Sequence, residues 1–244
     1  MKRLYLLLVL LALVVLAALF KPYLRTALAP VIGRFTHTKT VAQRLEQFGP
    51  AARARWQPYF VRAKIPYAPA RVTLIAIKAE RRLEVYAADG AGRQHWIRSG
   101  RILAASGDPG PKLSEGDGQV PEGIYPIESL NPNSLFHVSL RVGYPNALDR
   151  AQAAKEGRTN LGGDIMIHGD SVSIGCLAMG DEVAEDLFVL AADTGLPHLT
   201  IIITPVDFRQ AKTVSAKVKL PEWTDALYAD LKIHLAELPL ADAP

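Results

Sequence analysis

The stretch that decides the fold reads Arg71-Val72-Thr73-Leu74-Ile75-Ala76-Ile77, and Arg82-Leu83-Glu84-Val85-Tyr86 follows a few residues later. Both runs are rich in β-branched, aliphatic or aromatic residues, which favour strands over helices. The turn formers Asp89-Gly90-Ala91-Gly92 come next, followed by a third candidate strand, His95-Trp96-Ile97-Arg98. Strands that succeed one another across such short turns predict an antiparallel meander.

Further elements are expected downstream of this meander. Strand-like apolar runs recur at 136–142, 164–168 and 199–204. A helix is predicted from Asp181, as its N-cap, to Asp193, and a second helix over 222–238. Together these elements predict a mainly β fold with added helices (α+β), with a principal domain over residues 69–205 and a helix-bearing extension over 206–244.

Residues 22–68 are predicted to form a helical connector ahead of the principal domain. Apolar residues recur at helical spacing at Val41, Leu45 and Phe48, and Gly49-Pro50 then breaks the pattern. A second short helix is expected over 51–63. The connector is therefore predicted as two helices separated at Gly49-Pro50.

The N-terminus resembles an export or membrane segment. Met1-Lys2-Arg3 precedes an uncharged apolar run from Leu4 to Phe20, so residues 1–21 are interpreted as a signal anchor or signal peptide. The best small-residue cleavage site, Ala27-Leu28-Ala29, lies well past this run and is followed by proline. An uncleaved anchor with an exported body is therefore preferred over a cleaved signal.

Charge is distributed unevenly along the chain. Residues 37–103 contain 13 Lys/Arg and 4 Asp/Glu, a net charge of +9, whereas residues 104–244 contain 10 and 20, a net charge of −10. A basic region next to a membrane segment suits anionic headgroups or an acidic polymer. Aromatic interleaving and the motifs of nucleic-acid binders are absent from the sequence, so no nucleic-acid partner is expected.

The chain has a single cysteine, Cys176, and this is unusual for an exported protein. His168 ends an apolar run 176 − 168 = 8 residues earlier, and Gly169 and Gly175 allow the intervening loop to turn tightly. An imidazole near a thiol favours the reactive thiolate, and the backbone N–H groups at Gly175 and Cys176 are candidate oxyanion donors. An inert buried thiol and a metal site built from His168, Asp170 and Cys176 remain alternatives, the latter weak because no ligand cluster completes it.

Several co-linear motifs resemble the L,D-transpeptidase (YkuD-type) catalytic domain family, in its YafK-like branch. The first is Ser173-Ile174-Gly175-Cys176 with His168 upstream. The others are Gly110-Pro111-Lys112, the segment from Glu115 to Tyr125, Asn131 to Leu140, and Gly143-Tyr144-Pro145-Asn146. The resemblance covers about residues 70–205, in the family's order.

This resemblance implies a β-rich fold and a cysteine enzyme that acts on peptidoglycan stem peptides. Cys176 would form an acyl-thioester with His168 as its base, and Gly175, Gly169 and Ser173 would serve as oxyanion or orienting groups. Either the carbonyl of Gly169 or the carboxylate of Asp170 would orient the imidazole. Three further residues, Arg141, Tyr144 and Asn146, are candidates for contact with the acidic stem peptide.

Three functions remain open at this point. The first is acyl transfer between stem peptides, and the second is an amidase reaction that releases a peptidoglycan-linked lipoprotein with the same Cys–His pair. The third is a membrane-tethered wall-binding module without catalysis. The expected location is the bacterial cell envelope, in the periplasm and anchored to the inner membrane, and no cofactor and no metal are expected.

Overall fold

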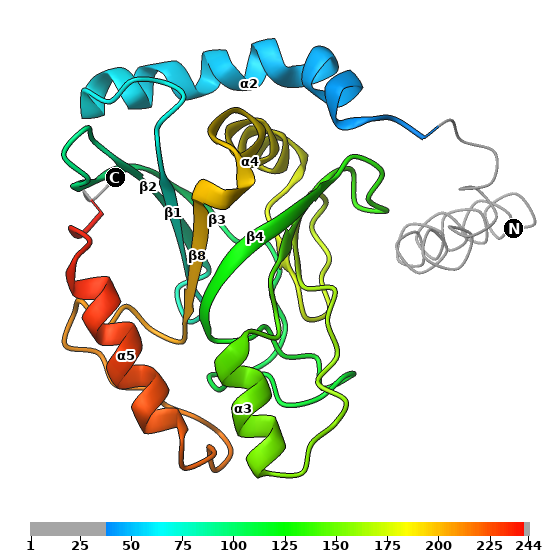
Figure 1. Cartoon of the computed structure of the whole chain (residues 1–244), viewed down its shortest axis with the longest axis vertical. Helices are drawn as coiled ribbons and strands as arrows, with labels where there is room; N and C mark the ends of the chain where they lie inside the picture. Colours follow the sequence, from blue (N-terminus) through cyan, green and yellow to red (C-terminus); the bar gives the residue numbers. More distant parts are fainter. Residues whose placement is uncertain (1–37, 242–244) are drawn as a thin grey trace, which may run out of the picture. The chain divides into compact units, whose positions relative to one another are not determined.

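A computed structural model describes residues 38–241 of the chain, and its centre is an eight-stranded sheet in the order β3-β2-β1-β8-β4-β5-β6-β7 (Figure 1). The strands are β1 Val72–Ile77, β2 Arg82–Ala88, β3 Gln94–Arg101, β4 Gly123–Asn131, β5 Ser139–Val142, β6 Met166–His168, β7 Leu177–Ala178 and β8 Leu199–Thr204. Neighbours pair antiparallel except β1 with β8 and β6 with β7, which are parallel. The predicted β-rich fold with added helices and the meander β1-β2-β3 are confirmed.

Both faces of the central strands are buried, which explains why their sequences are almost continuously apolar. Successive side chains of a strand point to opposite faces. In β1, Val72, Leu74 and Ala76 pack into one hydrophobic cluster, and Ile75 and Ile77 pack into another. Helices α2 (Val41–Ala63) and α4 (Asp181–Thr194) contribute to the first cluster, and α5 (Thr224–Ala236) covers the second face (Figure 1).

Helix α2 is continuous from Val41 to Ala63, so the predicted break at Gly49-Pro50 is wrong. Its buried face repeats every fourth residue, at Phe48, Ala52, Trp56 and Phe60. The indole Nε1 of Trp56 donates a hydrogen bond to the backbone oxygen of Asp186 in α4 at 2.8 Å. Proline inside a helix removes a backbone hydrogen bond, but burial of an aromatic face against a second helix offsets that loss.

The two other predicted helices are confirmed with small changes at their ends. Helix α4 begins at Asp181, but Asp181 is not its cap, because the N-cap is Gly180 and no side chain caps it. The Oδ1 atom of Asp181 instead accepts a hydrogen bond from the backbone N–H of Asp170 at 2.8 Å. The carboxylate therefore ties the helix to the loop that follows β6. Helix α5 occupies most of the predicted 222–238.

Two predicted strands are shorter than expected because a residue in the left-handed region interrupts each run. His137 has φ 74° and Asp164 has φ 54°, conformations that a strand does not accommodate. Strand β5 therefore begins only at Ser139, and β6 only at Met166.

Helix α3 (Ala147–Lys155) was not predicted from the sequence. Its signal was present, because Asn146 and Asp149 form a reciprocal capping box ahead of an alanine-rich run.

Residues from Lys39 onward belong to one compact unit, in which α2 and α5 pack on the sheet. The limits 22–68, 69–205 and 206–244 for connector, principal domain and extension stay predictions. The predicted membrane or signal segment, 1–21, lies outside the described residues. Across residues 38–241, no helix is both long and apolar enough to cross a membrane.

Candidate active site

The parallel pairing of β6 with β7 brings the histidine and the cysteine to neighbouring strands. Ile167 pairs with Leu177, and His168 pairs with Ala178. Ile167 and Leu177 point into the hydrophobic core, so the residues on either side of them face the opposite way. Cys176 directly precedes β7, next to the start of β6. A separation of eight residues along the chain thus becomes a short distance across two adjacent strands.

The imidazole of His168 is held in one orientation by its own loop. Its Nδ1 lies 2.6 Å from the backbone oxygen of Gly169. A carbonyl oxygen only accepts hydrogen bonds, so Nδ1 carries the proton and Nε2 is left as the basic nitrogen. The ring of Phe136 packs against the imidazole with a centroid distance of 4.7 Å. Of the two orienting groups considered from the sequence, the carbonyl of Gly169 makes this contact.

The thiol of Cys176 is held by backbone groups. Its Sγ accepts a hydrogen bond from the N–H of Met166 at 3.4 Å and lies 3.6 Å from the backbone oxygen of Asp164. Among the described residues, no hydrogen bond joins Sγ to the imidazole of His168. The two groups therefore lie on β6 and on the residue before β7, with no direct hydrogen bond between them.

Burial keeps both groups uncharged at neutral pH. Desolvation raises the pKa of the Cys176 thiol, although the hydrogen bond from Met166 opposes that rise. Desolvation lowers the pKa of His168, and the hydrogen bond to Gly169 opposes that change. The low-pKa thiolate expected from the sequence is therefore not the resting state. The resting pair is a thiol and a neutral imidazole that is able to accept its proton.

Ser173 fixes the backbone of the cysteine. Its Oγ accepts a hydrogen bond from the N–H of Cys176 at 3.0 Å and donates one to the carbonyl oxygen of Cys176 at 2.6 Å. The N–H of Gly175 donates to Oγ of Ser106 at 2.6 Å, and that hydroxyl donates to the oxygen of Gly118 at 2.7 Å. The two backbone N–H groups expected to be free for an oxyanion are thus occupied by serine hydroxyls.

Both predicted glycines are required by the backbone geometry. Gly175 has φ 80°, which side chains with a Cβ rarely adopt. A Cβ at Gly169 would lie 2.5 Å from Oδ1 of Asp181 and 2.8 Å from the backbone oxygen of Phe136. The loop between β6 and β7 accordingly passes too close to its neighbours at Gly169 for any other residue.

The three predicted substrate-contact residues have different surroundings. Tyr144 is buried, and its hydroxyl donates to the backbone oxygens of Lys112 and Leu161. Asn146 caps α3, and its side-chain amide donates to the oxygen of Ile124 at 3.1 Å. Only Arg141 presents a partly exposed charged group, with Nη1 at 2.7 Å from Oδ1 of Asp164. Of the three, only Arg141 is carried forward into the proposals below.

Two contacts of the candidate site were not foreseen from the sequence, namely those made by Ser106 and Asp164. Ser106 lies 69 residues from Gly175 along the chain. It falls in a loop rich in turn formers, where serine is ordinary. Asp164 contacts Cys176 through its backbone, which carries no side-chain signal. Only folding brings either residue to the cysteine.

A hollow of about 700 Å³ opens beside Asp164. Its lining residues come from β5, α3, the loops on either side of α3, and the loop between β3 and β4: Glu115, Arg141, Pro145, Arg150, Ala153, Ala154, Arg158, Thr159, Asn160, Leu161, Gly162, Gly163 and Asp164. Within residues 38–241, no group of three or more His, Cys, Asp or Glu side chains is arranged to hold a metal ion.

Known proteins resemble this chain in sequence and in structure. The family profile described as YkuD, L,D-transpeptidase catalytic domain, matches residues 71–206. A curated Escherichia coli (strain K12) protein named "Putative L,D-transpeptidase YafK" is 36% identical over 133 residues, which are 52% of this chain and 51% of that protein. The chain thus spans about half the length of the curated relatives it matches.

Solved structures that align with the chain share a lower sequence identity with it than the curated relative does. The helical cell shape determining protein Pgp2 from Campylobacter jejuni has a TM-score of 0.46 and 23% identity, covering 60% of this chain and 50% of that chain. L,D-transpeptidase 1 from Mycobacterium tuberculosis has a TM-score of 0.32 and 16% identity, covering 55% and 62%.

Proposed function

The chain belongs to the YkuD family of L,D-transpeptidase catalytic domains, and from this premise we propose that it transfers acyl groups on peptidoglycan stem peptides through Cys176. The observation that carries the proposal is the parallel pairing of β6 with β7, because Cys176 directly precedes β7 and contacts Met166 at the start of the strand that ends at His168. The hydrogen bond from Nδ1 of His168 to Gly169 supports it further, because it leaves Nε2 as a base.

In the proposed reaction, Sγ of Cys176 attacks the carbonyl carbon of a stem-peptide amide while Nε2 of His168 takes the thiol proton. The amide C–N bond then breaks, the acyl group remains on Sγ as a thioester, and His168 gives the proton to the leaving amine. An acceptor amine next attacks the thioester. His168 takes the proton of that amine and returns it to Sγ as the new amide leaves.

The backbone N–H groups of Gly175 and Cys176 are the proposed oxyanion donors. Each now donates to a serine hydroxyl, from Ser106 and Ser173 respectively. A substrate oxygen that replaces one of these hydroxyls keeps the N–H paired, so the exchange leaves no buried donor unsatisfied. The two serines would then hold the donors in position until the substrate binds.

A second outcome uses the same acyl-enzyme. If water rather than an amine resolves the thioester, the protein is an amidase or carboxypeptidase, and one such substrate is a lipoprotein linked to peptidoglycan. Both outcomes share every step up to the thioester of Cys176. They are separated by the products: new crosslinks or exchanged amines indicate transfer, whereas loss of lipoprotein remnants from muropeptides indicates hydrolysis.

The proposed location is the bacterial cell envelope, where peptidoglycan is found. Within that location, a periplasmic body anchored to the inner membrane through residues 1–21 remains a proposal. It is tested by fractionating cells that express the full chain and a chain lacking residues 1–21, and by measuring which fraction contains each.

The decisive experiment for the proposed function is intact-mass analysis of the purified protein after incubation with a stem-peptide donor or a carbapenem. We expect an adduct that proteolysis maps to Cys176. The Cys176→Ala variant controls for other nucleophiles and should form none. A folded wild-type sample that forms no adduct would overturn the proposal in favour of a wall-binding module. A Cys176→Ala variant that keeps full activity would overturn the assignment of Cys176 as the nucleophile.

A further inference from the structure

The hollow beside Asp164 is lined by three guanidinium groups, which differ in how far they are already neutralised. Arg158 is bound to the carboxylate of Glu156 and donates from Nη1 to the backbone oxygen of Leu113 at 2.7 Å. Its charge and its donors are therefore committed to the protein. Arg158 shapes the wall of the hollow rather than offering a free cation.

Arg141 is paired more loosely. Its Nη1 lies 2.7 Å from Oδ1 of Asp164, whose side chain is 78% exposed, and its Nε lies 3.5 Å from Glu128. Exposed ion pairs of this kind contribute about 0–1 kcal/mol, so another carboxylate is able to displace Asp164 at little cost.

Arg150 is the least engaged cation of the three. Across residues 38–241, its guanidinium makes no hydrogen bond and no ion pair within 4 Å, and its charge acts on the neighbouring carboxylate of Asp149 only through space. It lies on α3, one turn before Ala154, which also lines the hollow. The capping box of Asn146 and the burial of Ala153 fix this helix against the sheet side of the molecule. The cation is therefore displayed on a rigid element and faces space large enough for a peptide segment.

Asp164 connects this hollow to the reactive thiol. Its carboxylate pairs with Arg141 inside the hollow, while its backbone oxygen lies 3.6 Å from Sγ of Cys176. One residue, Asp164, therefore contacts both the hollow, through its side chain, and the thiol, through its backbone. Guanidinium groups bind carboxylates through paired, charge-assisted hydrogen bonds, which specify the position of the ligand as well as its charge.

We propose that this hollow binds a free carboxylate of the acyl-donor peptide through Arg150, with Arg141 released from Asp164 as a second contact. The inference rests on the proposed function for the identity of the peptide. It adds that the site prefers donor peptides that carry a free carboxylate. Arg150 binds this carboxylate and takes no part in the acyl transfer.

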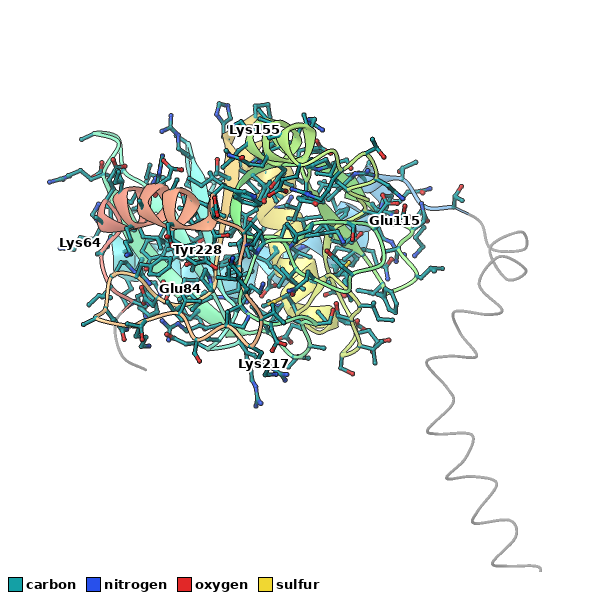
Figure 2. All side chains as sticks on the ribbon, turned by 90° about the horizontal axis from the view of Figure 1, so that it is seen from below. Lys64, Glu84, Glu115, Lys155, Lys217 and Tyr228 are labelled. Carbon is teal, nitrogen blue, oxygen red and sulfur yellow. The ribbon has the colours of Figure 1, made fainter. Side chains whose placement is uncertain are left out.

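The test compares two donor peptides that are identical except that one carries a free side-chain carboxylate and the other the corresponding amide. Binding is measured by titration calorimetry to the Cys176→Ala protein, which lacks the proposed nucleophile. The same binding is then measured with Arg150→Gln added. The matched control is Lys155→Gln, which removes a positive charge from the same helix (Lys155 is labelled in Figure 2). Lys155 is not among the residues that line the hollow.

We expect the free acid to bind about three- to tenfold more tightly than the amide, as for a partly exposed charge-assisted pair. Arg150→Gln should abolish this preference, Arg150→Lys should restore part of it, and Lys155→Gln should keep it. In the otherwise wild-type enzyme, Arg150→Gln should raise the KM for the acid by a similar factor with kcat unchanged.

An equal affinity for acid and amide, or a preference that survives Arg150→Gln, would overturn this inference. The same holds if Lys155→Gln weakens binding as much as Arg150→Gln, because the effect would then be one of overall charge. The proposed function is tested separately by intact mass, and it fails if the wild-type protein forms no adduct at Cys176. Arg150-dependent binding of the acid without acylation would support the hollow as a carboxylate site and overturn only the proposed chemistry.

Discussion

Replacing Ser173 by alanine should slow acylation of Cys176 while leaving the protein folded. The hydroxyl of Ser173 bonds both the N–H and the carbonyl oxygen of Cys176, at 3.0 and 2.6 Å. Alanine removes both bonds and leaves the backbone of the nucleophile without this clamp. The substitution adds no bulk, so steric effects do not confuse the result.

The magnitude follows from those two bonds. A typical hydrogen bond contributes about 1 kcal/mol net, and the two together amount to about 2 kcal/mol. If most of this free energy now holds the thiol in its reactive position, the acylation rate should fall by roughly 10- to 30-fold, since about 1.4 kcal/mol corresponds to tenfold. The free energy of unfolding should fall by no more than about 2 kcal/mol.

The assay is the rate of acyl-enzyme formation with a stem-peptide donor, followed by intact mass, together with chemical denaturation of the same samples. Ser171→Ala is the matched control, because Ser171 is exposed on the same loop and its Oγ makes only a 3.4 Å contact with Asp170. Ser171→Ala should react at the wild-type rate. Ser173→Thr keeps the hydroxyl and should recover part of the lost rate.

The reasoning would be refuted if Ser173→Ala acylated within twofold of the wild type while losing about 2 kcal/mol of stability. The hydroxyl would then stabilise the loop without positioning the thiol. Equal losses of rate in the Ser171 and Ser173 variants would also refute it, because general loosening of the loop would explain both.

The remaining predictions concern pH, a helix cap and a buried ion pair. Burial lowers the pKa of His168 below 6.5 and raises that of Cys176 above 9.0. The acylation rate, measured against pH, should therefore be constant between 6.5 and 9.0, and it should fall at acidic pH where His168 is protonated. The unfolded chain takes up the His168 proton at higher pH than the folded one, so stability to denaturant should also decline as the pH drops below 6.5. Asn146→Ala should lower the free energy of unfolding by about 1 kcal/mol and leave KM unchanged, whereas a raised KM would mean that Asn146 contacts substrate. Glu122→Gln should lower the free energy of unfolding by about 3 kcal/mol, because Lys78 lies 2.9 Å away and would stay buried without its counter-ion. A loss below about 1 kcal/mol in chemical denaturation would contradict the role of Glu122 as that counter-ion.

Several of the predictions from sequence were accurate because their signals are local. The β-branched and aliphatic run at 71–77 favours a strand wherever that strand lies, and Asp181 begins an apolar segment of helical length that forms α4. Errors arose where a tertiary contact overrode a local signal. Gly49-Pro50 should end a helix, yet Trp56 and Phe60 keep it continuous by packing into the core.

The sequence by itself determined the β-rich fold, the family, and the pairing of one thiol with one imidazole as the candidate chemistry. These follow from residue order, because periodicity and motif spacing are properties of near neighbours in the chain. Only the tertiary structure decided that both groups rest uncharged, that Ser106 and Ser173 occupy the N–H groups of Gly175 and Cys176, and that Arg150 lines the hollow with no hydrogen bond to any described residue. Burial and contacts between residues far apart in sequence exist only once the chain has closed on itself, so no local pattern encodes them.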